Sequence, residues 1–481
     1  MNHLKKIIYC CLLLLPALFS HAQKKKTAPV TLIGTSLLPA DSNQKVCIRN
    51  LEVAGTKRTK IYIVYREIHF KKGDSLSIAS FQKEMEQART QVYNTTLFNE
   101  VSFALTVIDS VNVDINVHVT ERWYLYPVPQ FQLVDRNLNE WWKTYHHSLD
   151  RVNYGIKFVH YNLSGRRDQL RIFLINGYTR NISFSYSNPY SNRSLTNGFT
   201  VTAGYSQSRE TPYKTDSANG ILLLRETGFS RQSVYGGIGF SIRKGLFKRH
   251  SFSIAYAHSK VNDSVIKLNP KYFNDPVNSK NIIDIAYLLQ YTNVNNVSYP
   301  LTGRSAFLSV QKRGLGFTGG INMLTLEAGY NKYFNLGKNW YGSIYLNGKL
   351  RLPFDQPYIN QRGLGYGENY LRGLEYYVID GVATALVKTT LKKKIVSFSI
   401  PFRLFPKVFT KIPFTFFAKT YGDLGYAYNK KSTYTYLNNR LLYAGGFGID
   451  ILTLYDINLR FEYSFNQLGK NGLFLHNQSG F

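Results

Sequence analysis

Cysteine and methionine are nearly absent from this sequence. It contains 3 Cys and 3 Met in 481 residues, and Cys10 and Cys11 both lie in an apolar run near the N-terminus. If that run is removed, only Cys47 remains, so no intramolecular disulfide can form. After the run, no stretch reaches about 18 consecutive apolar residues, which excludes a transmembrane helix.

Negative charge is also scarce. The chain has 29 Asp and Glu against 59 Lys and Arg, for a formal net charge of +30. Such a balance suits nucleic acid, but no basic helix or nucleic-acid motif accompanies it, so we expect no nucleic-acid partner. Attraction to anionic lipid head groups fits the charge. The alternative is that the basic residues are simply spread over solvated loops and a polar interior.

The motifs of common hydrolases are missing as well. Neither a GxSxG elbow nor an HExxH pair occurs in the sequence. His146 and His147 are adjacent, and we interpret them as a surface pair rather than as metal ligands. We therefore expect no catalytic residues, no metal and no cofactor, and predict that the protein is not an enzyme.

The N-terminus has the features of a secretory signal peptide, which we assign to residues 1–22. Lys5 and Lys6 precede the apolar run Ile7 to Phe19, and small residues then stand at the two positions that a signal peptidase reads, ending at Ala22. Residues 23–44 are Lys-rich and then mixed, without a sustained period. We expect them to form a flexible lead.

Aromatic residues and glycine are abundant: 37 Tyr, 31 Phe and 36 Gly. Together with low mean hydropathy, this is typical of closed barrels, which alternate apolar and polar residues. Alternation is clearest near the C-terminus, where Ile457, Leu459 and Phe461 alternate with polar residues. We predict a 16-stranded antiparallel transmembrane β-barrel over residues 124–481, at roughly 22 residues per strand. The assignment is open at 216–232, where Ile221 to Leu224 fits either a strand or a folded loop.

Residues 45–123 have a different pattern, that of a small α+β domain. A strand at Val46 to Val53 is followed by two helices and by strands at Val101 to Ile108 and Val113 to Val119. This order lets two helices cover a three-stranded sheet. The second helix presents a regularly spaced apolar face made of Ile78, Phe81, Met85, Ala88 and Val92.

Four stretches of this domain resemble a POTRA domain, the periplasmic module of the BamA/TamA superfamily of outer-membrane assembly and translocation barrels. They read VCIRNLEVAGTKRTK, KKGDSLS, NTTLFNEVSF and VNVDINVHVTERW. The resemblance implies a barrel in the outer membrane with a single POTRA domain, residues 45–123, in the periplasm. It also implies that the loop after the eleventh strand, residues 353–391, lies outside and folds back into the lumen.

Two short motifs in the barrel resemble signatures of the same superfamily. YLRG, ending at Arg372 and Gly373, is similar to a VRGF-like loop motif, although Leu371 and Leu374 replace its usual Val and aromatic residue. YGDLG, which contains Asp423 and ends at Gly425, is similar to an FxDxG strand motif.

Alternation places Asp423 on the lumen side of its strand, because it has the same parity as Lys419 and Tyr421. A carboxylate there can accept two parallel hydrogen bonds from the guanidinium of Arg372. We call this predicted contact the lumen-loop lock and assign Arg372, Gly373, Asp423 and Gly425 to it.

The first and last strands are expected to meet at a seam that opens easily. Pro127 and Pro129 are two residues apart, so both missing N–H groups lie on one edge of the first strand. If that edge faces the last strand, a substrate strand can pair there by β-augmentation. The alternative is a Pro-rich connection out of the POTRA domain. The chain ends on the aromatic Phe481, although Asn477 and Ser479 interrupt the alternation of the last strand.

The resemblance implies a factor that captures unfolded outer-membrane or secreted polypeptides in the periplasm and inserts or translocates them. Substrate strands would pair with the exposed edge of the POTRA sheet. Outer-membrane lipids and periplasmic or lipoprotein accessory factors are the other expected partners. A passive outer-membrane pore, or a structural surface protein without insertase activity, is the main alternative. An outer-membrane hydrolase is disfavoured because the catalytic motifs are missing.

Overall fold

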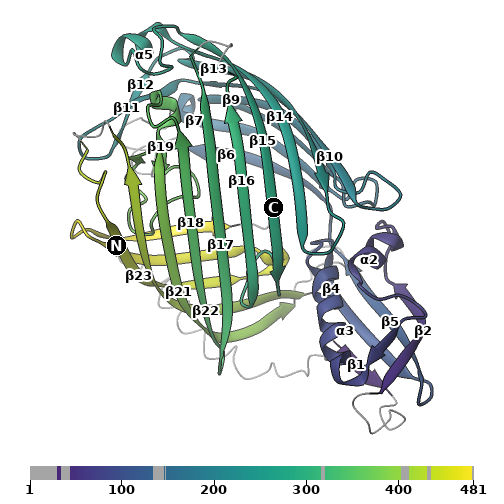
Figure 1. Ribbon diagram of the computed structural model, residues 1–481. Helices are drawn as coiled ribbons and strands as arrows, with labels where there is room; N and C mark the ends of the chain where they lie inside the picture. The colour runs from purple at the N-terminus through teal and green to yellow at the C-terminus, as the bar shows by residue number, and fades with distance from the viewer. Residues whose placement is uncertain are drawn as a thin grey trace.

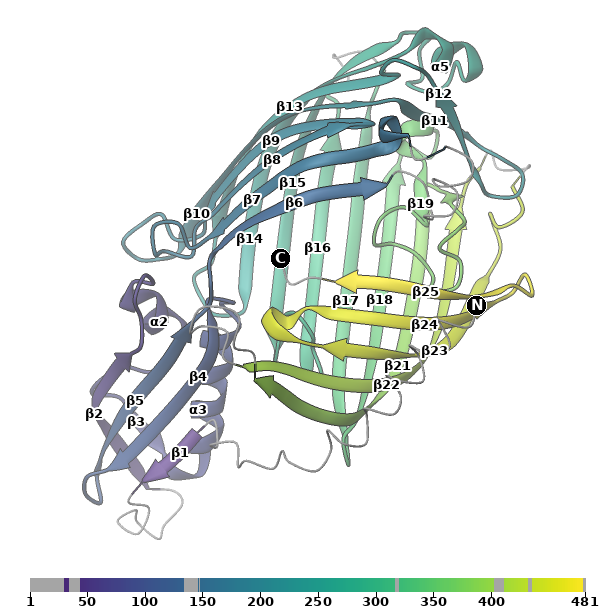
Figure 2. The same cartoon turned by 180° about the vertical axis from the view of Figure 1, so that it is seen from behind.

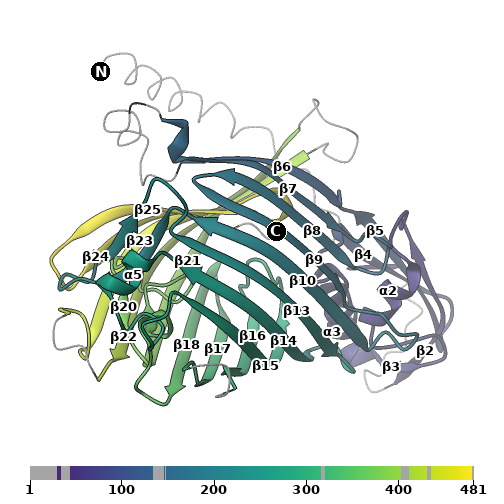
Figure 3. The ribbon, with the colours of Figure 1, turned by 90° about the horizontal axis from the view of Figure 1, so that it is seen from above.

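An N-terminal α+β unit lies beside one end of a large curved sheet that surrounds a lumen (Figures 1 and 3). The computed structural model describes residues 30–33, 44–133, 146, 148–315, 320–401, 411–430 and 435–478. The proposed signal peptide and Phe481 fall outside these ranges. Within them, no helix is long and apolar enough to cross a membrane.

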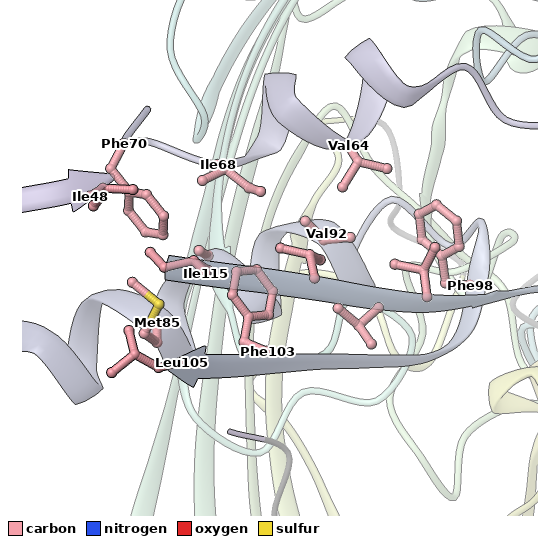
Figure 4. Packing of buried hydrophobic residues seen from close by; sticks show 14 of the residues in the cluster. Ile48, Val64, Ile68, Phe70, Met85, Val92, Phe98, Phe103, Leu105 and Ile115 are labelled. Carbon is pink, nitrogen blue, oxygen red and sulfur yellow. The ribbon is translucent and has the colours of Figure 1, made fainter. Parts of the chain in front are cut away.

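The α+β unit follows the predicted order of elements and adds two short strands. Its elements are β1 (Val30–Ile33), β2 (Lys45–Ala54), α2 (Ile61–Glu67), β3 (Ser75–Ser77), α3 (Ile78–Tyr93), β4 (Phe98–Val107) and β5 (Asn112–Glu121). The apolar face of α3 includes Phe81, and it packs on the sheet through Met85 and Val92 (Figure 4). Ile48, Phe103 and Ile115 meet it from the strands, which gives the unit its own core.

The sheet of this unit has five strands rather than the three that we predicted, in the order β1-β4-β5-β2-β3. β1 comes from the lead, which we expected to be flexible throughout, and it pairs in parallel with Phe103 to Thr106 of β4. Four residues are too few to show a period, and the partner that stabilises them is about 70 residues away in the chain. One edge of the sheet, that of β4, is therefore covered by β1.

The large sheet contains sixteen strands, as predicted. Each strand pairs in antiparallel fashion with the next one in the sheet, and β6 and β25 form the two ends. The strands are β6 (Leu125–Leu133), β7 (Val152–Tyr161), β8 (Gln169–Gly177), β9 (Thr179–Asn188), β10 (Asn197–Ser208), β13 (Arg231–Ile242), β14 (Lys248–Val261), β15 (Ser279–Val294), β16 (Gly303–Arg313), β17 (Met323–Gly337), β18 (Trp340–Leu352), β21 (Ala383–Pro401), β22 (Lys411–Tyr428), β23 (Leu442–Leu452), β24 (Asn458–Asn466) and β25 (Asn471–Gln478).

Side chains alternate between an apolar outer surface and the lumen, as the sequence pattern predicts. In β24, Phe461 and Phe465 are exposed on the outside, whereas Glu462 and Ser464 are buried on the lumen side. This alternation explains how the barrel combines low mean hydropathy with a continuous apolar outer surface.

The sequence misplaced the start of one strand. The twelfth strand was expected near Lys392, but β21 begins at Ala383, so the preceding loop ends at 382 rather than 391. Its first half alternates poorly because small residues face outward, while Leu386 faces the lumen and is buried under the loop. In the open region, Ile221 to Leu224 belong to a folded loop: β11 (Glu210–Thr215) and β12 (Ile221–Arg225) form a separate hairpin.

Candidate functional site: lumen loop, seam and domain interface

The structure brings the two polar residues of the predicted lock together. Arg372 donates from Nε to Oδ2 of Asp423 at 2.9 Å and from Nη2 to Oδ1 at 2.5 Å. Its backbone N–H donates to the same Oδ2 at 3.0 Å. The Asp423 side chain is fully buried and that of Arg372 is 11% exposed. One carboxylate thus holds both the side chain and the backbone of the loop.

The remaining donors of Arg372 are also satisfied. Nη1 donates to Thr390 Oγ1 at 3.0 Å and Nη2 to the carbonyl oxygen of Thr389 at 3.1 Å. The guanidinium lies over the ring of Tyr421, 4.0 Å from its centroid. Because burying a charge is costly unless it is paired and hydrogen-bonded, this complete set of partners is what allows the ion pair to sit inside the barrel.

Steric requirements explain why both motifs have a glycine, at positions 373 and 425. Gly373 has φ +95°, a conformation that favours glycine, and an added Cβ would lie 3.0 Å from Ser464 Cβ. Gly425 leaves room for the loop: a Cβ there would lie 2.7 Å from Leu371 Cδ1 and 3.2 Å from Leu364 Cδ1. Gly425 therefore leaves the space on β22 that the side chains of Leu371 and Leu364 occupy.

An apolar cluster seats the same loop against the barrel wall. Leu371 and Leu374, which replace the usual Val and aromatic residue of the motif, are each 1% exposed. The cluster joins residues of the loop to residues of β21, β22, β23 and the loop between β22 and β23, namely Leu364, Leu371, Leu374, Ile379, Leu386, Ala427, Leu437 and Leu442. The substitutions thus preserve apolar packing, and the loop is fixed by apolar contacts as well as by the ion pair.

A buried asparagine joins three outer loops, and the sequence analysis missed it. Asn219, in the β11–β12 turn, donates from Nδ2 to the Val378 carbonyl at 3.0 Å and to Asn438 Oδ1 at 3.1 Å. Its Oδ1 accepts from the Leu437 N–H at 2.8 Å. Its left-handed φ of +64° within an Asn-Gly pair signals a turn in the sequence, but gives no hint of these distant partners.

A second apolar cluster lies around helix α5, at the end of the barrel away from the α+β unit (Figure 1). Helix α5 (Asp263–Leu268) supplies Val265 and Ile266, which are buried together with Tyr272 and Phe273. Tyr358, from the lumen loop, packs against this cluster. The loops at this end of the barrel are therefore joined to one another by apolar contacts.

The lumen loop also contacts the last strand of the barrel. Tyr376 packs against Phe474 with ring centroids 5.4 Å apart, and Tyr370 stacks on His476 at 5.6 Å. His476 Nε2 lies 3.5 Å from Glu375 Oε1. The loop therefore bridges the lock on β22 and the lumen face of β25.

A charged network that we did not predict lines the lumen beside the lock. Lys419 forms ion pairs with Asp450 and, at 2.6 Å, with Glu462 Oε1. Tyr299 donates its hydroxyl proton to Asp450 Oδ2 at 2.7 Å. Strand parity correctly placed Lys419 in the lumen, but it could not identify partners on other strands.

Among the described residues, neither end of the sixteen-stranded sheet has a partner on its outer edge (Figure 2). The N–H of Tyr161 in β7 donates to the carbonyl oxygen of Tyr124, the residue just before β6. The backbone of Tyr124 therefore faces β7. Because backbone groups alternate between the two edges, even-numbered residues of β6 face β7. Pro127 and Pro129 therefore lie with their missing donors on the free edge, toward the seam.

The two end strands also expose large apolar side chains. Leu473 and Leu475 of β25 are 68% and 65% exposed, and Phe131 of β6 is 67% exposed. Both the backbone and the side chains of these strands are thus available to another polypeptide or to lipid. Phe481, the third residue that we assigned to the seam, lies outside the described residues.

The α+β unit is held to the barrel by a buried ion pair that the sequence analysis missed. Arg243, after β13, donates from Nη1 and Nη2 to Glu67 at 2.6 and 2.7 Å, and Tyr190 donates to Glu67 Oε1 at 2.6 Å. Burial alone would raise the pKa of Glu67, but the hydrogen bonds and charge of Arg243, with Arg167 and Tyr190, bring it below its ordinary value. The sequence contained one signal of this contact, because Glu67 is a charged residue on the apolar face of its helix.

A second contact ties the unit to strands near the other end of the sheet. Arg122 Nη2 lies 2.8 Å from Asp456 Oδ2, and Tyr93 donates to Asp456 Oδ1 at 3.2 Å. Tyr455 and Asp456 have φ values of +58° and +61°, which are strained for residues with side chains. The unit thus contacts turns from both halves of the sheet and lies across the mouth of the barrel (Figure 2).

Comparison with known proteins identifies the two parts of this architecture. A family model described as "POTRA: Surface antigen variable number repeat" matches residues 46–122. BamA from Haemophilus ducreyi lacking POTRA domains 1-3 has a similar structure, with 14% sequence identity and a TM-score of 0.50 over 90% of this chain and 84% of that chain. CdiB from Escherichia coli is similar at 11% identity and a TM-score of 0.50, over 90% and 75% of the two chains. No curated protein matches the sequence.

At these levels of identity the similarity concerns the fold. The N-terminal unit is a POTRA domain, and the sheet has the fold of the BamA barrel. The predicted fold, a sixteen-stranded antiparallel β-barrel preceded by a POTRA domain, is thereby confirmed.

Proposed function

We propose that this protein lies in an outer membrane, receives unfolded polypeptides on its periplasmic POTRA domain, and passes them through the seam into or across the membrane. The observation that carries this proposal is the seam. Each end strand has one unpaired edge among the described residues, and Pro127 and Pro129 remove two donors from the free edge of β6. A seam that pairs weakly with itself can be replaced by pairing with a substrate strand.

The POTRA domain lies where a substrate would enter. Its contacts with Arg243 and with Asp456 fix it at the periplasmic mouth, next to the lower ends of the strands. β1 already occupies the edge of β4, in parallel pairing. In this proposal, a substrate strand replaces β1 on β4 before it moves to the seam.

The lumen loop has a positional role in the mechanism. Its lock holds it on β22, while Tyr376 and Tyr370 support the lumen face of β25. This contact keeps β25 in place when its outer edge is unpaired. The lock is therefore a positioning device for the seam, and no chemical step or cofactor is needed.

A passive pore is the alternative to this proposal. The lumen loop argues against it, because Arg372 and Asp423 hold this loop inside the barrel. A pore also gives no role to a POTRA domain or to an unpaired seam.

Depletion of the protein separates the two functions. We expect other outer-membrane proteins to fall in abundance, or a secreted substrate to accumulate in the periplasm, as measured by quantitative proteomics of cell fractions. Complementation with the wild-type gene is the control. Unchanged protein levels together with reduced solute uptake would contradict the proposal and support a pore. Accessory periplasmic or lipoprotein factors would be identified by co-purification.

A further inference from the structure

Five exposed cations follow the periplasmic end of the outer barrel surface. Lys248, Arg304, Lys332 and Lys393 lie on strands β14, β16, β17 and β21, and Lys244 lies in the β13–β14 turn; all are exposed. Each strand cation has the parity of exposed apolar residues on its own strand, Phe252, Leu308, Tyr330 and Leu391 respectively. They therefore point toward lipid and not into the lumen. We call these five residues the basic belt.

Aromatic rings, and not carboxylates, are the neighbours of the basic belt. The Arg304 guanidinium lies 5.5 Å from the centroid of Tyr291, and the Lys393 ammonium lies 5.1 Å from that of Trp340. Within the described part of the chain, no belt residue forms an ion pair. A cation on a ring keeps its charge available for an anion.

The sequence around the belt contains no acidic residues. Asp and Glu are absent from 227–262, 285–326, 328–354 and 381–422, which include the belt residues and most of their strands. The net positive charge is thus concentrated, on this wall, at the level where head groups of the inner leaflet lie. Charge of one sign next to an apolar surface is complementary to an amphiphile with an anionic head.

The β13–β14 turn adds a cavity to the belt. Lys244, Lys248 and His250 line it together with Phe247 and Tyr291, and its volume is about 540 Å³. The apolar wall continues onto Phe252, on the lipid-facing surface. The cavity therefore presents cations at its mouth and an apolar wall directed toward the membrane interior.

We propose that the basic belt binds the phosphate groups of anionic phospholipids in the periplasmic leaflet, with the β13–β14 cavity as its main site. The phosphate lies between Lys244 and Lys248, and an acyl chain follows Phe247 and Phe252. This inference depends on the membrane-spanning fold and does not depend on insertion activity.

The same turn also docks the POTRA domain. Arg243 pairs with Glu67 on its inner side, and the carbonyl oxygens of Arg243 and Gly245 accept from Arg66 Nη2 at 2.7 and 2.9 Å. A lipid bound on the outer side stiffens the turn that holds Glu67. Anionic lipid therefore stabilises the docked POTRA domain.

Native mass spectrometry of the full chain tests the proposal. The protein would be titrated with phosphatidylglycerol and, separately, with zwitterionic phosphatidylethanolamine. We expect phosphatidylglycerol to bind more tightly, and the triple variant Lys244→Gln, Lys248→Gln, Arg304→Gln to lose affinity for it on the order of 100-fold. The matched control is Lys260→Gln with Lys312→Gln, two outward-facing lysines at the opposite ends of their strands, which we expect to bind normally.

Hydrogen exchange of Arg66 and Glu67 in lipid nanodiscs provides the second readout. We expect slower exchange in phosphatidylglycerol than in phosphatidylethanolamine, and no such difference for the triple variant. Equal affinity for the two lipids, or an equal loss in the control variant, would overturn the proposal. Because neither measurement uses a polypeptide substrate, a failed insertion assay would leave this result unaffected.

Discussion

Asp423 is the residue on which the position of the lumen loop depends most. Its two oxygens accept three hydrogen bonds from Arg372, and Arg372 finds its other acceptors on β21. Strand parity was sufficient to predict that Asp423 faces the lumen, and the motif resemblance supplied its partner. Neither could predict Glu67 or Asn219, because their partners are distant in sequence and belong to no motif.

Removing the Arg372 side chain should leave the Asp423 charge buried and unpaired. We expect Arg372→Ala to destabilise the seated loop by about 3–5 kcal/mol. A lower temperature of unfolding in semi-native gel electrophoresis would show this loss. Arg440→Ala, at an exposed Arg in another outer loop, is the control. The double variant Arg372→Leu, Asp423→Leu should cost less than the two single changes added, and strict additivity would argue against a coupled pair.

A substitution at Gly425 tests, by a steric effect alone, whether Leu371 of the lumen loop needs the space beside β22. Gly425→Ala places a methyl group against Leu371 and should cost about 1–3 kcal/mol by overpacking. Gly422→Ala, on the same strand, meets nothing closer than 3.7 Å and should be nearly neutral. Limited proteolysis of the loop compares the two variants. Equal protection of both would show that Leu371 does not need the space.

At the scale of elements, the sequence predicted the regular strands of the barrel wall better than the strands whose position depends on contacts with other parts of the chain. The sixteen strands that we predicted from the length of the region are all present, because a strand and its turn together need roughly 22 residues. β21 was placed too late because its lumen-facing Leu386 is covered by the loop. β1 was missed because a four-residue strand is stabilised by its partner and not by its own pattern.

Restoring donors to β6 should strengthen the seam. Pro127→Ala with Pro129→Ala adds two N–H groups to the free edge, each able to contribute about 1 kcal/mol when paired. We expect the rate at which proteoliposomes containing the variant fold an added outer-membrane protein to fall by roughly one order of magnitude. Val128→Ala, whose N–H faces β7, is the control. An unchanged or faster rate would mean that the prolines do not weaken the seam.

The stability of the contact between the POTRA domain and the barrel should depend on pH through Glu67. Because the folded pKa of Glu67 is lowered, its contribution is complete above the unfolded pKa of about 4.5 and is lost as pH falls through the folded value. We expect hydrogen exchange in α2 to accelerate below about pH 4.5. Glu67→Gln should remove this step while leaving α3 unaffected. A step that persists in the variant would assign it to another carboxylate.

On the scale of the whole molecule, the two ends of the barrel differ from each other. One end of the barrel carries loops that contact each other, the opposite end contacts the POTRA domain, and among the described residues β6 and β25 each leave one edge unpaired. Composition and alternation predicted the barrel, and the resemblance predicted the single POTRA domain. The domain's position across the mouth could not be predicted, because it depends on contacts such as Arg122 with Asp456 that involve strained turns.

Photo-crosslinking at the seam tests the central claim most directly. A photoreactive amino acid would replace Phe131, Leu473 or Ile238, which are 67%, 68% and 64% exposed, the last of them in the middle of the wall on β13. With a stalled polypeptide substrate bound, we predict crosslinks from positions 131 and 473 and none from position 238. Crosslinks of equal yield at all three positions, or none at the seam, would contradict the proposal that substrates pass between β6 and β25.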